Sequence, residues 1–379
     1  MTGRHGLAGR LALAALALLA AACGKIETWE GDPVPVVFST YAQRSTKAHA
    51  SYVAPGANFA AGAEIGVFGF YHDGNGATDG SWAADKAAGN NIPDYMYNQL
   101  VTKQDDGSWL YSPIKYWPNE TGTDGNGATS QHIDKLSFWG YYPRNAAGLN
   151  LYAAETTTAY SNKTSGLPKI TFTQSEDPDE MIDLMFTALQ KDLYKNDASQ
   201  HGYITNGAVN LVFKHALALV EFQLAEGTGA KLNTLDLTNI KKSGTVEEPG
   251  TVPFVWSASS EYTTHIEDLD VHEATLLRLL AVPQTLNANA TFTLNYDITF
   301  ESSDPTHPDP IVYKGDSFSV KLFDNTNDDP AKRYGVTKWE AGKHYIYKIS
   351  AGLDRIEFEE IVEDTDDWSI GNDNISVPE

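Results

Sequence analysis

Hydrophobic and polar residues alternate along several short segments of the chain. The clearest is Thr291–Phe300, where Phe, Leu, Tyr, Ile and Phe share one face and polar residues occupy the other. Alternation with a period of two residues is typical of a strand that has one buried and one solvated face. Shorter segments with this pattern predict further strands at residues 169–173, 317–322, 344–350 and 355–363.

Two further segments, residues 64–71 and 135–143, are apolar on both faces, which predicts strands buried between a sheet and other parts of the chain. Helical periodicity is nearly absent. Only residues 273–283 could begin with a helical turn, and we expect a strand toward their end, before Pro283. Turns rich in Gly, Asn, Asp and Pro separate the segments. The pattern predicts an all-β protein built of antiparallel sandwiches.

A change of phase divides the apolar run at residues 208–225. Val209, Leu211 and Phe213 share one phase, whereas Val220 and Phe222 take the other. A slipped phase within a continuous run predicts a bulge or bend near Ala218. The polar stretch at residues 189–207 precedes this run and predicts a domain boundary, with one domain at 45–200 and a second at 201–379.

The N-terminus has the features of an export signal. Arg4 and Arg10 form a basic region, and the apolar run at residues 11–22 is too short to cross a membrane, which takes roughly 20 apolar residues. Small residues precede Cys23, the only cysteine of the 379 residues. The pattern resembles a bacterial lipoprotein signal, although the preferred leucine, Leu19, lies one place too far upstream. It predicts a signal peptide at residues 1–22 and a lipid on Cys23; an ordinary secretory signal is the alternative.

Composition narrows the classes of function. With no second cysteine, neither disulfides nor thiolate metal sites can hold the fold, so stability must come from apolar burial. The formal net charge of −23 argues against nucleic acid as a partner, because a polyanion would be repelled. The chain is rich in Tyr and Phe, which favours broad sheets in an exported protein.

Patterns of catalytic or metal-binding residues are incomplete. Residues 315–318 (GDSF) resemble the start of a serine esterase block, but the residues that should follow are missing. The histidines of residues 265–273 have a spacing that fits neither a helical nor a strand zinc site. His215 lies in an apolar strand and is expected to be a core histidine with a satisfied hydrogen bond. We therefore expect no enzyme, no cofactor and no metal site.

Two alternatives to this expectation stay open. Residues 73–80 (DGNGATDG) alternate oxygen ligands as a calcium loop does, although they lack the glycine and the final glutamate of an EF-hand. A glycosidase needs only two carboxylates facing each other across a cleft, and the chain has 50 acidic residues. A surface hydrolase is therefore a further hypothesis.

Short motifs resemble the fimbrillin family, the Mfa-like and FimA-like lipoproteins of Bacteroidales surface pili. They follow the family's order along nearly the whole chain, and their order and spacing together are specific. They are the cysteine motif ending at Cys23, STYAQRST around Arg44, EIGVFGFY (64–71), YNQLVTKQDDGSWLYSPIKYWPN (97–119), LSFWGYYP (136–143), DLMFTA (183–188), VFKHALALVEFQL (212–224), AVPQT (281–285) and WEAGKHYIYKI (339–349).

The resemblance implies a fold and an assembly route. The fold would be two tandem transthyretin-like β-sandwich domains after the lipoprotein signal peptide. The lipidated segment at residues 23–44 would be cleaved after Arg44, leaving Ser45 as the first residue, with Lys47 as an alternative cleavage site. Residues 33–44 form a strand-like segment, and removing it would expose an apolar groove and unpaired backbone groups that accept a strand from a neighbouring subunit.

The C-terminal segment is the candidate donor strand. Its alternating apolar residues Ile356, Phe358 and Val362 could insert into the pockets of a neighbour. The alternative is that the same segment closes the sheet of its own domain. Both roles remain open for different parts of the segment.

The resemblance also implies a function and a location. The chain would be a structural subunit or adhesin component of a cell-surface pilus, partnered by other fimbrillin subunits and by the outer membrane through the lipid on Cys23. A monomeric surface lipoprotein that binds a glycan or a host protein is the alternative, and a host or bacterial surface receptor is an open partner. Tyr116 and Trp117 are expected to pack near a proline turn, with stacking on a glycan as the alternative.

Overall fold

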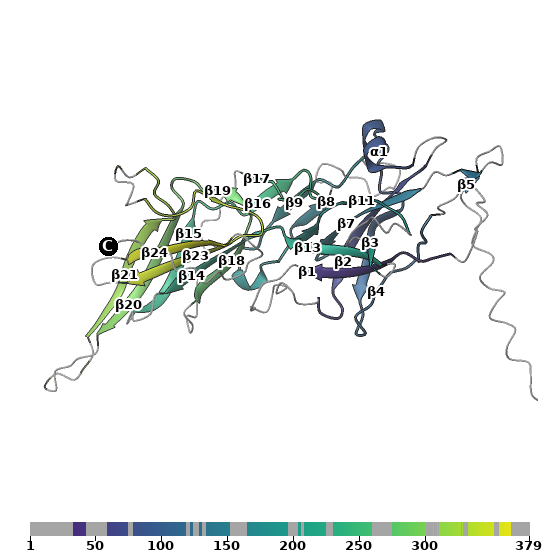
Figure 1. The fold of residues 1–379 in the computed structure, drawn as a ribbon. Coiled ribbons are helices and arrows are strands. Elements are labelled where there is room, and N and C mark those ends of the chain that lie inside the picture. The colour runs from purple at the N-terminus through teal and green to yellow at the C-terminus, as the bar shows by residue number, and fades with distance from the viewer. Residues whose placement is uncertain are drawn as a thin grey trace, which may run out of the picture.

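The structure is a computed structural model of the chain. It describes residues 33–42, 59–74, 79–118, 122–123, 129–130, 134–151, 165–195, 204–205, 208–224, 230–259, 275–300, 306, 309, 311–326, 328, 333–351 and 356–364. Almost every regular element among these residues is a strand, so the expected all-β class is confirmed. The strands form an elongated molecule, with β1 to β4 in one half and β20, β21, β23 and β24 in the other (Figure 1).

The largest sheet has nine strands in the described part of the chain. The order along it is β1-β13-β10-β7-β2-β3-β4, with β11 beside β7 and β12 beside β13. The bounds are β1 (Val37–Ala42), β2 (Glu64–His72), β3 (Met96–Lys103), β4 (Trp109–Leu110), β7 (Lys135–Tyr142), β10 (Met185–Thr187), β11 (Gln190–Leu193), β12 (Ile204–Thr205) and β13 (Ala208–His215). The pair β1–β13 is parallel, and the other neighbours in this sheet are antiparallel.

The middle of this sheet is buried on both faces. Along β2, Ile65 and Val67 belong to one core cluster, and Phe68 and Phe70 belong to another. The strand β7 divides its side chains in the same way. The prediction that the segments apolar on both faces are buried strands is therefore confirmed.

A second sheet covers one face of the first. It has the order β17-β16-β9-β8. The bounds are β8 (Leu149–Leu151), β9 (Ile170–Thr173), β16 (Ser243–Val246) and β17 (Trp256–Ala258). Ile170 and Phe172 of β9 share a core cluster with Phe68 of β2. This sheet thus joins strands that lie far apart in the sequence into one layer of the first sandwich (Figure 1).

The other half of the molecule is a second sandwich. One sheet has the order β18-β14-β23-β24 and the facing sheet has the order β15-β20-β21. The bounds are β14 (Ala218–Leu224), β15 (Ala230–Thr238), β18 (Thr275–Ala281), β20 (Thr291–Phe300), β21 (Ile311–Lys321), β23 (His344–Ala351) and β24 (Ile356–Asp364). Phe222 of the first sheet stacks on Phe292 of the second with ring centroids 4.9 Å apart. Aromatic stacking of this kind adds to the burial that holds the layers together.

Smaller elements complete the described structure. Two two-stranded ladders pair β19 with β22 and β5 with β6. The bounds are β5 (Gly122–Thr123), β6 (Thr129–Ser130), β19 (Gln284–Thr285), β22 (Lys338–Trp339), α1 (Trp82–Ala88) and the 3₁₀ helix η2 (Pro178–Glu180). No helix in the described ranges is long and apolar enough to span a membrane.

The two sandwiches share one core cluster. It contains Phe70 of the first sandwich and Tyr347 of the second. Trp256 donates a hydrogen bond of 2.7 Å from its indole to the carbonyl oxygen of Ala216, which lies where the chain passes from one sandwich to the other. The chain leaves the nine-stranded sheet after His215 and enters the second sandwich at Ala218. The bend predicted near Ala218 is therefore this change of sheet.

The segment at residues 273–283 could have begun with a helical turn and was expected to end as a strand. The described part, from Thr275, is the strand β18 and pairs with β14, whereas residues 273 and 274 lie outside the described ranges. The apolar residues Leu277 and Leu279 alternate into the core as strand residues do. Packing against β14 thus decides the conformation over any local helical preference.

The helix α1 was not predicted. It is only 7 residues long, so apolar periodicity cannot identify it. Its signals are the caps: the Ser81 side chain accepts a hydrogen bond from the Ala84 amide, and Gly89 ends the helix with a φ of 72°. Serine at the N-cap and a left-handed glycine after the last turn are the common start and stop of helices.

Candidate functional site

The backbone of residues 34–42 is hydrogen-bonded to two neighbours: β1 pairs with β13, and the residues just before β1 bond to the segment that follows β4. On one side it runs parallel to β13, with Val37 opposite Ala208 and Ala42 opposite Phe213. On the other side the Val36 amide donates to the Lys115 carbonyl oxygen at 2.8 Å, and the Trp117 amide donates to that of Val34 at 2.9 Å. Residues 34–42 therefore fill a slot between β13 and the segment that follows β4.

Alternate side chains of this segment enter the core. Val36 and Phe38 are buried, whereas Val37 between them is exposed, as the two-residue period of a strand requires. The Phe38 ring contacts Tyr111 and Phe138, with centroids 5.6 and 5.5 Å away. Burying a side chain of this size stabilises a fold by about 1.5–3 kcal/mol.

Polar contacts set the position of β1 in the slot. The Ser39 hydroxyl donates a hydrogen bond to the side-chain oxygen of Asn210 on β13. The Tyr111 hydroxyl donates to the carbonyl oxygen of Val36 at 2.6 Å. Burial raises the pKa of Tyr111 to about 12, so this hydroxyl keeps its proton well above neutral pH.

The fit of β1 is incomplete in two places. The Thr40 hydroxyl and the Trp117 indole nitrogen are buried with no hydrogen-bond partner among the described residues. A buried polar group without a partner costs about 1–3 kcal/mol. Both groups belong to the slot or to the strand that fills it.

An apolar core lies beneath β1 and would form a groove if β1 were removed. Val36 and Phe38 belong to the second core cluster, the groove core. Its other buried members are Phe59, Ile65, Val67, Met96, Val101, Trp109, Tyr111, Trp117, Leu136, Phe138, Met185, Leu193, Val209, Leu211 and Phe213. Without β1, part of this core and the free edge of β13 would face water, and an unpaired edge above apolar pockets is a template for another strand.

The processing residues predicted from the sequence lie outside the described part. These are Cys23, Arg44 and Ser45. The described strand β1 ends at Ala42, two residues before Arg44. Residues 265–273 and the middle of the loop at 73–80, residues 75–78, also lie outside the described ranges.

The candidate donor strand lies at the edge of the second sandwich. It forms β24, which pairs antiparallel with β23, and Val362 lies opposite Ile346. Phe358 lies opposite Ile349 and Ile356 opposite Ala351. In this structure β24 extends the sheet of its own chain and lies in the half of the molecule away from β1 (Figure 1).

Three buried histidines of the described residues, His72, His215 and His344, lie beside carboxylates elsewhere in the fold. His215 accepts or donates a hydrogen bond with Asp183 at 2.9 Å, and both side chains are buried, as expected for a core histidine. His72 lies 2.6 Å from the Asp85 carboxylate and 2.7 Å from the Ser137 hydroxyl. The sequence of contacts Ser137–His72–Asp85 resembles a Ser-His-Asp nucleophilic triad.

The cluster around His72 was not predicted from the sequence. Ser137 is fully buried, and its hydroxyl accepts a further hydrogen bond from the Asp192 amide at 3.0 Å. Without access for a substrate, the cluster ties α1, which carries Asp85, to strands β2 and β7. The part of the chain that the structure describes contains no group of three or more metal-ligating side chains.

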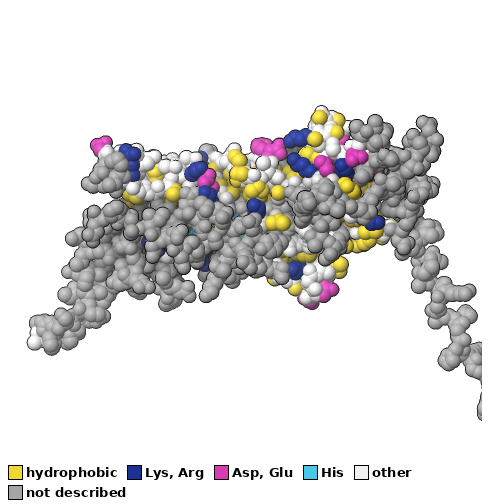
Figure 2. Space-filling view, viewed as in Figure 1, with side chains coloured by type: hydrophobic (Ala, Val, Ile, Leu, Met, Phe, Trp, Pro, Cys, Tyr) yellow, Lys and Arg dark blue, Asp and Glu magenta, His cyan; other side chains and the backbone are white. Residues whose placement is uncertain are grey.

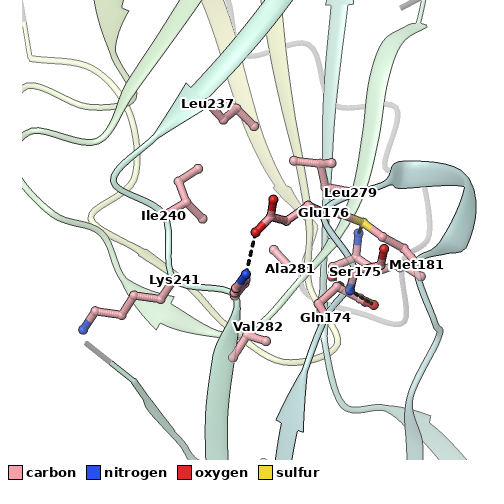
Figure 3. Close-up of a pocket in the computed structure, with 12 residues that line it drawn as sticks. Gln174, Ser175, Glu176, Met181, Leu237, Ile240, Lys241, Leu279, Ala281 and Val282 are labelled. Atoms are coloured by element: carbon pink, nitrogen blue, oxygen red, sulfur yellow. Dashed lines mark hydrogen bonds and ion pairs between the residues drawn. The ribbon is translucent and has the colours of Figure 1, made fainter. Parts of the chain in front are cut away.

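A small cavity lies between the sandwiches (Figure 3). It is lined by Gln174, Ser175, Glu176 and Met181 from one side and by Leu237, Ile240, Lys241, Lys242 and Leu279–Val282 from the other. Its free space is about 30 Å³, which suits one or two water molecules rather than an organic ligand. Lys242 pairs with Glu176 at 2.5 Å across it. The cavity is a packing gap between the two sandwiches and is too small for an organic ligand.

Comparisons with known proteins agree with this fold. A family model described as fimbrillin-like matches residues 46–365. A fimbrial protein from Bacteroides vulgatus is 17% identical, with a TM-score of 0.50 over 80% of this chain and 92% of that chain. A candidate cell adhesion protein from Bacteroides uniformis is 18% identical, with a TM-score of 0.49 over 89% and 99%.

A further candidate cell adhesion protein, from Bacteroides ovatus, is 17% identical, with a TM-score of 0.45 over 90% of this chain and 99% of that chain. At such low identity, the likeness to the Bacteroides vulgatus protein bears on the fold alone. No curated protein matches the chain.

Proposed function

Because the chain belongs to the fimbrillin-like family, we propose that it is a structural subunit or adhesin component of a cell-surface fimbria, assembled by strand exchange at the β1 groove. The family supports the fimbrial role, and the fimbrial protein from Bacteroides vulgatus shares its fold. The role is non-enzymatic. It is carried out by polymerisation with other fimbrillin subunits at the cell surface.

One observation carries the exchange mechanism. The strand β1 lies at the edge of its sheet, fills an apolar groove with Val36 and Phe38, and ends two residues before the arginine at which cleavage is expected. Cleavage after Arg44 would detach β1 from the body of the chain, and a strand from a neighbouring subunit would take its place. Ser45 would then be the first residue of the mature subunit.

The incomplete fit of β1 favours exchange. The buried Thr40 hydroxyl and Trp117 indole nitrogen lack partners in the described structure, which weakens the hold of β1 on the groove. An incoming strand that supplies an acceptor near Trp117 and carries an apolar residue in place of Thr40 would bind more tightly. The C-terminal segment with Ile356, Phe358 and Val362 is the proposed donor, and it must leave β23 to act.

The route to the surface is part of the same proposal. Residues 1–22 direct export, Cys23 carries the lipid that holds the precursor on the outer membrane, and residues 23–44 stay with that lipid after cleavage. The two domains are proposed at residues 45–200 and 201–379. Strand β13, which forms one wall of the groove, then comes from the second of these segments.

A disulfide lock tests the exchange directly. Ser39 and Asn210 lie opposite each other on β1 and β13 and are hydrogen-bonded, so the double variant Ser39→Cys/Asn210→Cys places two thiols within bridging distance. We expect the oxidised variant to be exported and cleaved but to remain monomeric, and to assemble when a reductant opens the bridge. The single variant Ser39→Cys is the control.

Two outcomes would contradict parts of the proposal. Normal high-mass polymers from the oxidised double variant would show that β1 need not leave the groove. An Arg44→Ala variant should remain anchored and unassembled, whereas a Lys47→Ala variant should assemble normally. If Lys47→Ala stayed anchored and unassembled while Arg44→Ala assembled, the cleavage site would be Lys47 instead of Arg44.

A further inference from the structure

Exposed apolar side chains gather around β1. Six large hydrophobic residues are exposed in the described part of the chain, and four of them lie on or beside β1. These four form the β1 patch: Val37 (39% exposed), Leu110 (54%), Ile114 (46%) and Tyr116 (41%). Hydrophobic side chains are visible at the surface in this region of the molecule (Figure 2).

Backbone contacts place the patch residues beside β1. Pro35 forms an isolated antiparallel bridge with Tyr116, and the Val36 amide donates to the carbonyl oxygen of Lys115, which follows Ile114. β4, which carries Leu110, also contacts β1. Because Val36 and Phe38 point into the groove core, Val37 points to the opposite, outer side. The patch is therefore the outer surface above the groove.

The patch is too small to hold a second copy of the chain by itself. Stable protein interfaces bury roughly 1,200–2,000 Å² in total, and four side chains on one partner contribute only a fraction of this area. A contact with a surface to which the chain is already tethered can form with much less buried area. A short linker raises the effective concentration of the tethered partner to the millimolar range.

The chain supplies such a tether. The lipid proposed on Cys23 is separated from Pro35 by few residues, and an extended chain spans at most about 3.3–3.6 Å per residue, so the reach is about 40 Å. Pro35 adjoins Val37 and bridges to Tyr116. The tether therefore joins the described structure at the edge of the patch, within about 40 Å of the lipid.

We propose that in the lipidated precursor the β1 patch lies on the membrane surface, with Val37, Leu110 and Ile114 in the apolar boundary and the Tyr116 hydroxyl toward the headgroups. This inference rests on the lipid anchor of the proposed function. Aliphatic side chains with a tyrosine at their rim are the usual composition of interfacial membrane contacts.

Charge near the patch is balanced. Lys103 and Lys115 lie beside it, each over an aromatic ring, and Asp105 and Asp106 occupy the tip of the β3–β4 hairpin. Acidic and basic side chains therefore offset each other, and we expect the contact to depend on apolar burial and to be insensitive to headgroup charge.

The proposal gives the cleavage a second effect. Val37 belongs to the segment that would stay with the lipid, whereas Leu110, Ile114 and Tyr116 belong to the body of the subunit. Loss of β1 would divide the patch between two molecules. One cut would therefore remove the covalent anchor and weaken the membrane contact together.

A fluorescent label near the patch tests the contact. The lipid occupies the thiol of Cys23, so an introduced cysteine is the only reactive one. The lipidated full chain with Ile114→Cys carries an environment-sensitive dye and is reconstituted with phosphatidylcholine vesicles that contain nitroxide-headgroup lipid, with or without phosphatidylglycerol. The control is Val255→Cys, an exposed position (74%) in the loop before β17.

We expect several-fold stronger quenching at position 114 than at 255 in both kinds of vesicle. Adding Leu110→Ser and Tyr116→Ser to the Ile114→Cys chain should reduce this quenching several-fold, and since both sites are exposed the fold should persist. Equal quenching at 114 and 255 in chains that float with the vesicles would overturn the membrane contact alone. Chains that fail to float would overturn the lipid anchor as well.

One further result would reassign the patch. A dye response at position 114 that appears without vesicles and grows with protein concentration would show that a second copy of the chain covers the patch. That result would overturn the membrane contact. It would leave the proposed strand exchange unaffected.

Discussion

The Tyr111 hydroxyl donates a hydrogen bond of 2.6 Å to the carbonyl oxygen of Val36. This bond joins β1 to the segment after β4, on the side opposite β13. It is the side-chain counterpart of the backbone bond between the Val36 amide and Lys115. Because Tyr111 is itself part of the groove core, the same residue lines the groove and holds the strand that fills it.

Replacing Tyr111 by phenylalanine should loosen β1 without emptying the groove. The variant loses a buried hydrogen bond, worth about 1 kcal/mol, and leaves the Val36 carbonyl without that partner. Hydrogen–deuterium exchange of the amides in β1 should become about five-fold faster. In the control Tyr345→Phe, whose hydroxyl accepts from the Glu340 amide in the other half, exchange in β1 should not change.

Phe38 and Val37 offer a matched pair on the two faces of β1. Phe38→Ala should lower the free energy that holds β1 in the groove by about 3–5 kcal/mol, because it empties a packed site between Tyr111 and Phe138. Val37→Ala, on the exposed face, should change stability by less than about 0.5 kcal/mol. Denaturant titration measures both, and equal effects would show that Phe38 does not anchor β1.

Gly66 and Gly140 make a second pair, on neighbouring strands. A Cβ at Gly66 would lie 2.1 Å from the Tyr141 ring, which cannot retreat because its hydroxyl donates to Asn98 and to the Arg144 carbonyl oxygen. A Cβ at Gly140 would make only ordinary contacts, the nearest at 3.4 Å. Gly66→Ala should therefore destabilise by about 1–3 kcal/mol.

Thermal unfolding compares these two glycine variants. The melting temperature of Gly140→Ala should stay close to that of the parent chain, and that of Gly66→Ala should fall by several degrees. A Gly66→Ala chain that melts like the parent would show that the Tyr141 ring is free to move.

Alkaline pH should destabilise the fold through its buried tyrosines. Burial raises the pKa of Tyr111 and of Tyr141 to about 12 from an ordinary value of 10.0. The unfolded chain then loses these protons first, so the stability that they contribute is complete below pH 10 and is lost as the pH rises toward 12. The free energy of unfolding should fall steeply across this window.

Phenylalanine at these two positions is the control for the pH dependence. The double variant Tyr111→Phe/Tyr141→Phe should show a shallower fall between pH 10 and 12, whatever its stability at neutral pH. A slope identical to that of the parent chain would mean that other groups govern the alkaline transition.

Local pattern was enough to predict much of the fold. The alternation in Thr291–Phe300 matches β20 over its whole length, and the change of phase near Ala218 marks the passage between sheets. The strand nature of β1 was also predictable. Its parallel pairing with β13 was not, because Val37 and Ala208 are far apart in the sequence and their pairing is a property of the whole fold.

Short or tertiary features escaped sequence analysis. The helix α1 depends on its caps at Ser81 and Gly89, and the His72 cluster brings together side chains from three elements. Tyr116 and Trp117 were expected to pack near a proline turn, but the sequence did not show that the two side chains face opposite ways. Trp117 is buried beneath β1, and Tyr116 faces outward.

The most direct measurement is the N-terminus and intact mass of the subunit recovered from assembled surface fibres. If β1 is released by cleavage and replaced by a neighbour's strand, the chain begins at Ser45, lacks residues 23–44 and runs as heat-sensitive ladders of high mass. A chain that begins at acylated Cys23, still carries β1 and remains monomeric would contradict strand exchange at this groove.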